Sequence, residues 1–132
     1  MILICGIPNA GKTTYSQKFS NAIHYDEMNG TIKDRCALLN ELAKNNGSVF
    51  EGVFGEAKMR KELVSNSKGN AVCIWIDTPI DVCIEREKNY RRRSLGMVEM
   101  HHNNFETPTL DEGWDEIIII RGNNEQRISK QG

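Results

Sequence analysis

Short apolar runs alternate along most of the chain with longer segments in which apolar residues recur three or four positions apart. Each apolar run has the length of a strand and ends at a glycine or a polar residue. The run at 71–76 is apolar throughout, which is typical of a strand covered on both faces of a parallel sheet. The pattern predicts strands over 2–5, 21–25, 48–51, 71–76 and 116–120.

The segments between these runs have the spacing of helices. Apolar residues of the segment 31–46 fall on one helical face, and Thr78 and Pro79 fit the N-cap and the first position of a later helix. The polar segment 121–132 predicts a frayed end and no further strand. We expect helices over 13–20, 31–46, 56–67 and 95–104, and one that begins at 78.

Strands that alternate with helices favour an α/β fold with a five-stranded, mostly parallel sheet. Right-handed crossovers between parallel strands place helices on both faces of the sheet. A chain of 132 residues can bury a core of its own, so we expect one domain over 1–132. Ligands of such sheets bind at the carboxyl ends of the strands. The residues that follow each predicted strand are therefore the candidates for chemistry.

The segment after the first predicted strand, 6–14, fits the P-loop pattern Gly-x-x-x-x-Gly-Lys-Thr. A strand before it and a helix after it are the context that this pattern requires, and together they predict a P-loop NTPase fold. Gly6 and Gly11 permit the backbone angles that turn N–H groups inward around a polyphosphate, and the helix N-terminus favours the anion. The predicted nucleotide-binding residues are Gly6, Asn9, Ala10, Gly11, Lys12, Thr13 and Thr14.

Two side chains of this segment have specific tasks toward ATP or another nucleoside triphosphate. Lys12 is expected to reach the β- and γ-phosphates, and the hydroxyl of Thr13 is expected to bind Mg²⁺. The alternative is a glycine-bearing turn that happens to precede Lys-Thr. The predicted strand and helix on either side favour nucleotide binding.

Acidic residues follow three of the other predicted strands. Asp26 can accept the proton of an acceptor hydroxyl as it attacks the γ-phosphate, although an acid at the start of a loop is more often only a surface residue. Glu51 ends the third strand, where many P-loop proteins hold an acid that orients Mg²⁺ through water. For Asp77 we favour a structural role in the turn before the Thr78 helix.

Four arginines fall within eight residues in the segment 86–93. On a helix that begins near 79, Arg86, Tyr90 and Arg93 share a face that differs from the apolar one. Such a run is usually a solvated face. Phosphoryl transfer, however, spreads charge over oxygens that arginines stabilise, so we interpret the segment as a mobile lid. The same cations could hold a phosphorylated acceptor.

Composition and weaker motifs narrow the function classes further. The formal net charge is −1, and no apolar run is long enough to cross a membrane. The four cysteines lie in apolar segments without C-x-x-C spacing, which favours reduced thiols and a cytoplasmic location. His101 and His102 lack metal-ligand spacing and are expected to be exposed. Phe105 and Trp114 could stack on bases, but we expect them to anchor the loop at Pro108 against the core.

Taken together, these motifs resemble the kinase domain of polynucleotide 5′-hydroxyl kinases. The resemblance spans nearly the whole chain and is carried by the segment 6–14, Asp26, Asp77-Thr-Pro with the arginines from Arg86 onward, and the segment 105–117. The last segment resembles the Phe-Glu-x-Pro…Glu-Gly stretch before the final strand in that family. It also occurs in relatives that phosphorylate other acceptors, including aminoacylated tRNA, so it does not fix the substrate.

The resemblance implies a P-loop NTPase fold of the small kinase type, with ATP- and Mg²⁺-dependent transfer of the γ-phosphate to the 5′-OH end of DNA or RNA. It implies Asp26 as general base, with Lys12 and the lid arginines on the phosphates. The catalytic residues predicted in this way are Asp26, Lys12, Arg86, Arg91 and Arg93. The chain departs from the family at two places: 27–30 has no arginine for a 3′-phosphate of the acceptor, and Tyr90 stands where the second lid arginine usually lies.

Two other functions stay open at this point. A kinase of the same fold could act on a small molecule, a nucleotide or a tRNA-linked hydroxyl, which fits the small size, the near-neutral charge and the absent acceptor arginine. A nucleotide-dependent switch or motor is the third possibility. Against it, the sequence has no Asp-Glu pair at the end of an apolar strand and no Asn-Lys-x-Asp motif.

Overall fold

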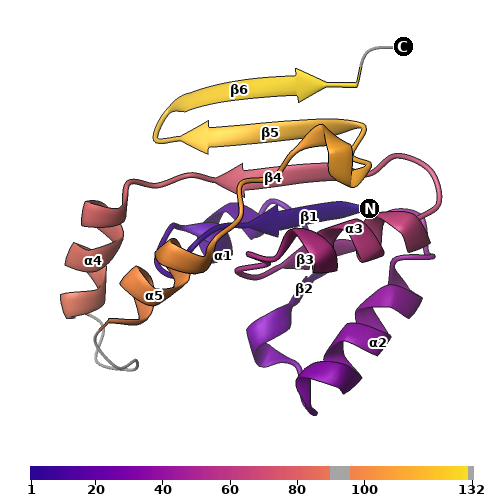
Figure 1. Cartoon of the computed structure of the whole chain (residues 1–132), viewed down its shortest axis with the longest axis horizontal. Coiled ribbons are helices and arrows are strands. Elements are labelled where there is room, and N and C mark those ends of the chain that lie inside the picture. The colour runs from indigo at the N-terminus through magenta and orange to yellow at the C-terminus, as the bar shows by residue number, and fades with distance from the viewer. Residues whose placement is uncertain (90–95, 131–132) are drawn as a thin grey trace.

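The chain forms one parallel-rich sheet with helices on both faces, as the alternating pattern predicts (Figure 1). The computed structural model describes residues 1–89 and 96–130. The strand order is β2-β3-β1-β4-β5-β6, and all neighbouring strands are parallel except β5 and β6. The strands are β1 Ile2–Cys5, β2 Ala22–His24, β3 Val49–Glu51, β4 Val72–Ile76, β5 Glu116–Arg121 and β6 Asn124–Ser129.

The five expected helices are present with modest changes at their ends. The helices are α1 Lys12–Ser16, α2 Ile32–Leu42, α3 Ala57–Asn66, α4 Ile80–Asn89 and α5 Met97–Asn104, with 3₁₀ turns η1 Tyr25–Glu27 and η2 Leu110–Glu112. α1 is shorter than expected because the chain after Ser16 tightens into bonds between residues three apart. α2 begins at a capping box, in which the Thr31 hydroxyl accepts from the backbone N–H of Asp34 at 3.1 Å.

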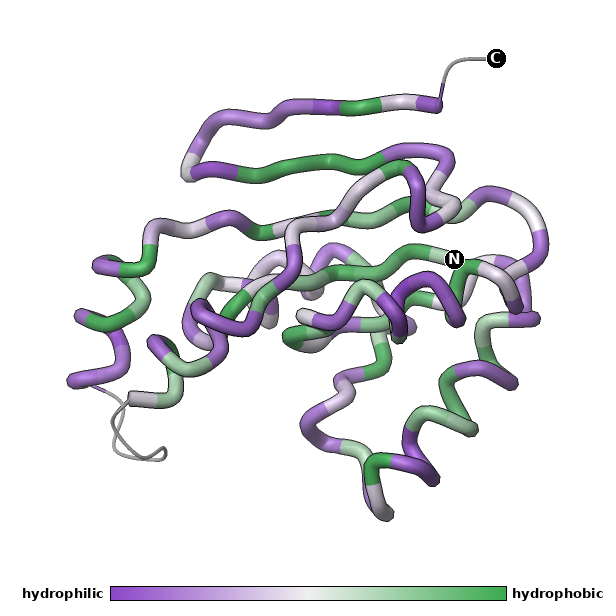
Figure 2. The backbone as a smooth tube through the Cα atoms, in the orientation of Figure 1, coloured by the Kyte–Doolittle hydropathy of each residue, from purple (hydrophilic) through white to green (hydrophobic). Residues whose placement is uncertain are grey.

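The apolar residues of β1 point alternately into two cores, one on each face of the sheet. Leu3 packs in one cluster with Leu39 of α2 and Leu63 of α3, and Ile4 packs in the other with Cys83 of α4. All five side chains are buried. Figure 2 shows hydrophobic runs along the strands, the most continuous of them in β5. The prediction of helices on both faces is confirmed.

The sheet has six strands, so the prediction of five strands with a frayed end was wrong. Gly122 and Asn123 form a two-residue turn, in which Gly122 has a φ of 59°, and β6 then pairs with β5 along its length. β6 lies at the edge of the sheet with exposed side chains and is largely hydrophilic (Figure 2). Polar side chains are tolerated on β6 because backbone hydrogen bonds to β5 hold the strand in place, so its side chains need not be buried.

A buried ion pair ties the segment before β5 to α3. Arg60 is fully buried, and its guanidinium donates to both carboxylate oxygens of Glu112 at 2.8 and 2.9 Å. The indole N–H of Trp114 donates to the same carboxylate at 3.0 Å. Trp114 is itself fully buried, and Phe105 stacks on Trp75 at a centroid distance of 5.9 Å. These contacts confirm that the two aromatic residues pack against the core.

Within residues 1–89 and 96–130, no helix is long and apolar enough to cross a membrane. The four cysteines are free thiols, and three of them, Cys5, Cys73 and Cys83, are buried.

Candidate active site

The P-loop lies between β1 and α1, at the carboxyl edge of the sheet, and its glycines are required by its geometry. Gly6 has a φ of 154°, and a Cβ atom there would lie 2.7 Å from the carbonyl oxygen of Ile76. Gly11 has a φ of 102°. No residue with a side chain would fit at Gly6 without moving β4, and both backbone angles favour glycine. These are the two positions at which the sequence pattern demands glycine.

Polar groups of this loop point into a cavity of about 940 Å³. Lys12 is 7% exposed, and its ammonium donates to the carbonyl of Ile7 at 2.8 Å, which places the cation inside the loop. Asn9 also lines this cavity, and its side-chain amide nitrogen is buried without a hydrogen-bond partner in the described part of the chain. A buried donor of this kind is costly unless an acceptor reaches it. An anionic ligand such as a polyphosphate fits that requirement.

Thr13, Glu51 and His24 meet beside the loop. The hydroxyl of Thr13 donates to Oε1 of Glu51 at 3.1 Å, and Nδ1 of His24 lies 2.9 Å from the same oxygen. Glu51 ends β3, the neighbour of β1, and is only 5% exposed. A hydroxyl and a carboxylate at the mouth of a phosphate loop are ligand types that Mg²⁺ accepts, directly or through water. The residues present therefore fit a magnesium site formed together with phosphate oxygens. His24 was not predicted as part of this group.

Arg86 of α4 lies over the P-loop. Its Nη1 donates to the carbonyl of Asn9 at 2.8 Å, and the hydroxyl of Thr78, just before α4, donates to the carbonyl of Ala10 at 2.6 Å. The segment that leads into α4 and the middle of α4 are therefore both hydrogen-bonded to the loop. Arg91 and Arg93, the other two predicted lid residues, lie outside the described residues.

Glu87 of α4 has a structural role that the sequence did not indicate. Its carboxylate is 4% exposed and accepts from the backbone N–H groups of Gly96 at 3.1 Å and Val98 at 2.9 Å. An acid at the N-terminus of α5 satisfies donors that have no partner within the helix. Glu87 thus fixes α5 against α4.

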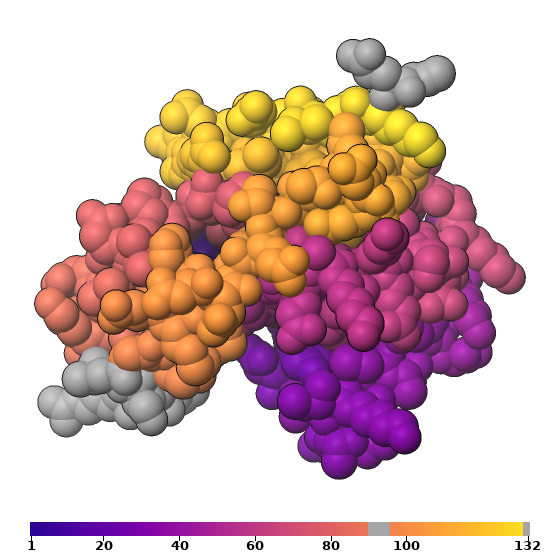
Figure 3. Space-filling model, in the orientation of Figure 1, coloured from indigo at the N-terminus to yellow at the C-terminus, as the bar shows by residue number. Residues whose placement is uncertain are grey.

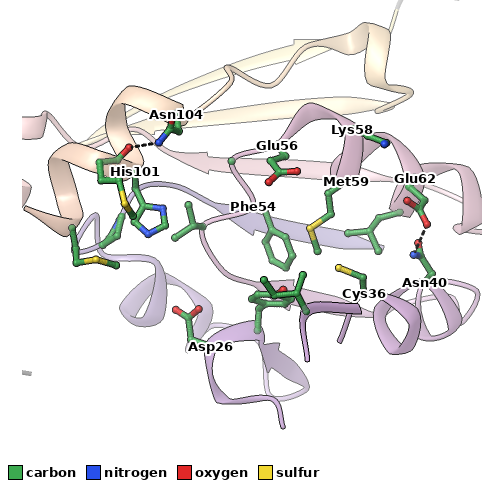
Figure 4. A pocket seen from close by; sticks show the side chains of 18 residues that line it. Asp26, Cys36, Asn40, Phe54, Glu56, Lys58, Met59, Glu62, His101 and Asn104 are labelled. Carbon is green, nitrogen blue, oxygen red and sulfur yellow. Dashed lines mark hydrogen bonds between the residues drawn. The ribbon is translucent and has the colours of Figure 1, made fainter. Parts of the chain in front are cut away.

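A second cavity, of about 1210 Å³, lies next to the first. Its walls come from α2, α3, α5 and the segment after β3, and Figure 3 shows this face hollowed between the α5 and α2 regions. Asp26 lines both cavities, and it is the one residue of 1–89 and 96–130 that does so. In Figure 4 its carboxylate points into the second cavity from one side, while His101 points in from the other.

The geometry bears on two sequence interpretations. Arg121 donates to the carboxylate of Asp77 at 2.6 Å, and neither residue lines either of the two cavities, which fits a structural role for Asp77 through a contact with β5. His101 is half-buried on the wall of the second cavity, so the expectation that it is simply exposed was wrong; His102 is exposed. The described residues contain no cluster of three potential metal ligands from His, Cys, Asp and Glu.

No protein-family model matches the chain, and no curated protein is similar to it in sequence. Solved structures do match. A gluconokinase from Sinorhizobium meliloti 1021 is 13% identical with a TM-score of 0.72, covering 93% of this chain and 82% of that one. An unliganded sugar kinase from Janibacter sp. HTCC2649 is 15% identical with a TM-score of 0.69, covering 91% of this chain and 83% of that one. At these identities the likeness establishes the fold alone, which the chain shares with these two kinases. Neither protein is a polynucleotide kinase.

Proposed function

We propose that this chain is a single-domain kinase that transfers the γ-phosphoryl group of ATP, with Mg²⁺, to a hydroxyl group of a small molecule. The observation that carries the proposal is the position of Asp26 between two adjoining cavities. P-loop residues 9–14 line one cavity, whereas Pro8 is the one P-loop residue that lines the other. A donor in the first and an acceptor in the second would meet at this carboxylate.

Each residue has a distinct task in this proposal. The P-loop amides, the Asn9 amide and Lys12 bind the β- and γ-phosphates, and Arg86 stabilises the charge on the transferred group from α4. Asp26 accepts the proton of the acceptor hydroxyl as the hydroxyl oxygen attacks the γ-phosphorus of ATP. Mg²⁺ neutralises charge on the phosphate oxygens when it is bound. Thr13 and Glu51 hold the metal, Glu51 through water, and His24 orients the Glu51 carboxylate.

The 5′-OH end of DNA or RNA is the second candidate acceptor, favoured by the sequence resemblance at 105–117. That segment is held by the Arg60–Glu112 pair and by the buried Trp114, which gives its residues a packing role. A packing role does not select an acceptor. The two kinases of similar fold, a gluconokinase and a sugar kinase, support the small-molecule alternative instead.

The test is acceptor labelling with γ-labelled ATP and Mg²⁺. The acceptors are a panel of small hydroxyl compounds, which includes gluconate, monosaccharides, nucleosides and amino alcohols, together with 5′-OH DNA and RNA oligonucleotides. We expect label on a small acceptor and none on oligonucleotide ends. Label on the oligonucleotides alone would establish the second candidate, and ATP hydrolysis without any labelled acceptor would favour a switch.

A further inference from the structure

Two large apolar side chains are exposed at the mouth of the cavity beyond the P-loop. Ile32 of α2 is 69% exposed and Met100 of α5 is 46% exposed, and both line this cavity. Single exposed apolar residues are normal on a protein surface, but apolar residues gathered around a concave site are typical of ligand contacts. These two residues therefore indicate a ligand with an apolar body.

The inner wall contains an aromatic residue in a strained conformation. Phe54 has a φ of 42° and is 6% exposed, although a bulky residue rarely adopts a positive φ. Arg60 donates to the carbonyl of Phe54 at 2.8 Å, and the ring of Tyr25 packs against that of Phe54 at 5.5 Å. The buried pair of Arg60 with Glu112 thus fixes the backbone that presents this wall. Figure 4 shows the Phe54 ring facing the cavity. Strain held by surrounding structure is characteristic of binding sites.

The formal charges on the wall are mainly negative. Asp26, Glu56 and Glu62 line the cavity, against a single lysine, Lys58. In the described part of the wall there is no arginine. Glu62 accepts a hydrogen bond from Asn40 at 2.8 Å on the same wall (Figure 4). A phosphate or carboxylate group in this cavity would meet repulsion from these carboxylates.

We infer that this cavity selects, as the phosphoryl acceptor, a small hydroxyl compound that has an apolar body and carries no negative charge. The inference rests on the proposed function, because it takes the donor to be bound at the P-loop. The acceptor hydroxyl lies against Asp26, its apolar body contacts Phe54 and Met100, and a cationic amine is favoured by Glu56 and Glu62. Anionic sugar acids and nucleic acid ends are disfavoured by the same charges.

The test compares probes that share a hydroxyl and a phenyl group and differ in charge. These are phenylalaninol, which is cationic, 3-phenylpropan-1-ol, which is neutral, and 3-phenyllactate, which is anionic. A 5′-OH trinucleotide is the fourth probe. Binding to the full chain, loaded with Mg²⁺ and a non-hydrolysable ATP analogue, is measured by ligand-observed NMR. We expect the cationic and neutral probes to bind about fivefold or more tightly than the anion, as a few solvent-exposed charges can provide.

Two surface variants locate the binding in this cavity. Glu56→Lys is expected to reduce the preference for the cationic probe, whereas Asp111→Lys, which makes the same charge change at an exposed site outside the cavity, is expected to leave it unchanged. Met100→Trp narrows the mouth and should weaken the binding of every probe. Ile128→Trp, which introduces the same side chain at an exposed residue of β6 outside the cavity, is the control for Met100→Trp. Nucleotide affinity, measured in parallel, should be the same in all four variants.

The inference is overturned if the anion or the trinucleotide binds as tightly as the neutral probe, if none of the probes binds, or if Met100→Trp has no effect. Probe binding is measured without any phosphoryl transfer, so failure of the inference can be distinguished from failure of the proposed function. If the uncharged and cationic probes bind selectively but no hydroxyl compound is phosphorylated, the proposed function is contradicted and the inference stands. Phosphorylation of anionic acceptors alone would overturn the inference and leave the kinase activity standing.

Discussion

Nη1 of Arg86 donates a 2.8 Å hydrogen bond to the carbonyl oxygen of Asn9, which joins the middle of α4 to the centre of the P-loop. The two residues are 77 positions apart in the sequence. Asn9 has a φ of 66°, so the carbonyl that accepts this bond belongs to a residue in the left-handed backbone conformation. This contact places an arginine that the sequence singled out directly over the loop that we expect to hold the phosphates.

Replacing Arg86 tests whether this contact serves catalysis. We expect Arg86→Ala to lower the rate of phosphoryl transfer about a hundredfold or more, because an arginine that stabilises the transferred group contributes on that scale. The side chain is exposed, so thermal stability should change little. Lys88→Ala, which removes an exposed cation of the same helix, is the control. A large loss of stability in Arg86→Ala, with the rate per folded molecule unchanged, would make Arg86 structural.

Asp26 is expected to act on the acceptor and not on ATP. Asp26→Asn keeps the shape of the side chain but removes the base, so transfer should fall about a hundredfold to ten-thousandfold. The affinity for a non-hydrolysable ATP analogue, measured by calorimetry, should stay within about twofold. Asp111→Asn, which makes the same change at an exposed acid outside both cavities, is the matched control. Near wild-type transfer by Asp26→Asn would exclude this residue as the base.

The pair formed by Thr13 and Glu51 predicts a change in magnesium dependence. Glu51→Gln weakens the group that would orient water around the metal, so the Mg²⁺ concentration needed for half-maximal nucleotide binding should rise about tenfold. Thr13→Ser retains the hydroxyl and should bind Mg²⁺ almost normally, whereas Thr13→Val should not. An unchanged Mg²⁺ requirement in Glu51→Gln would show that this carboxylate has only a packing role.

The buried pair of Arg60 and Glu112 predicts a large effect on stability. Arg60→Met leaves the Glu112 carboxylate buried without its partner, which typically costs about 3–5 kcal/mol of unfolding free energy. Lys61→Met changes an exposed neighbour on α3 and should shift stability by about 0.5 kcal/mol or less. Urea denaturation of both variants measures the difference. A small loss in Arg60→Met would mean that the carboxylate finds another partner.

The same pair predicts a pH dependence. Burial by itself raises the pKa of Glu112, but the hydrogen bonds from Arg60 and Trp114 outweigh it, and the pKa lies below its ordinary value of 4.5. A carboxyl with a lowered folded pKa stabilises the fold fully above pH 4.5, and this stabilisation is lost as the pH falls through the folded pKa. We therefore expect stability below pH 4.5 to fall more steeply in the wild type than in Glu112→Gln. Equal slopes would contradict this origin.

The order of most elements and the P-loop could be predicted because each has a strong local signal. Apolar runs mark β1, β4 and β5, and the Gly-Lys-Thr spacing marks the loop between β1 and α1. β6 was missed because its side chains are polar; the Gly122-Asn123 dipeptide was the available signal for its hairpin turn.

Features that depend on distant contacts could not be predicted from the sequence. Arg60 and Glu112 lie 52 residues apart. Glu112 belongs to the segment 105–117 that resembles the kinase family, but nothing in the sequence pairs it with Arg60. The second cavity likewise forms only when α2, α3 and α5 come together, so nothing in the sequence indicates that its exposed apolar residues and its carboxylates lie on one wall. The identity of the acceptor depends on that cavity. The local motifs therefore predict the donor side of the site better than the acceptor side.

The most direct measurement is transfer of label from γ-labelled ATP to small hydroxyl compounds, with wild type and Asp26→Asn assayed side by side under Mg²⁺. The account predicts a labelled small-molecule product with the wild type, its near-complete loss with Asp26→Asn, and equal nucleotide binding by both proteins. Label on 5′-OH oligonucleotide ends alone, or undiminished transfer by Asp26→Asn, would contradict it.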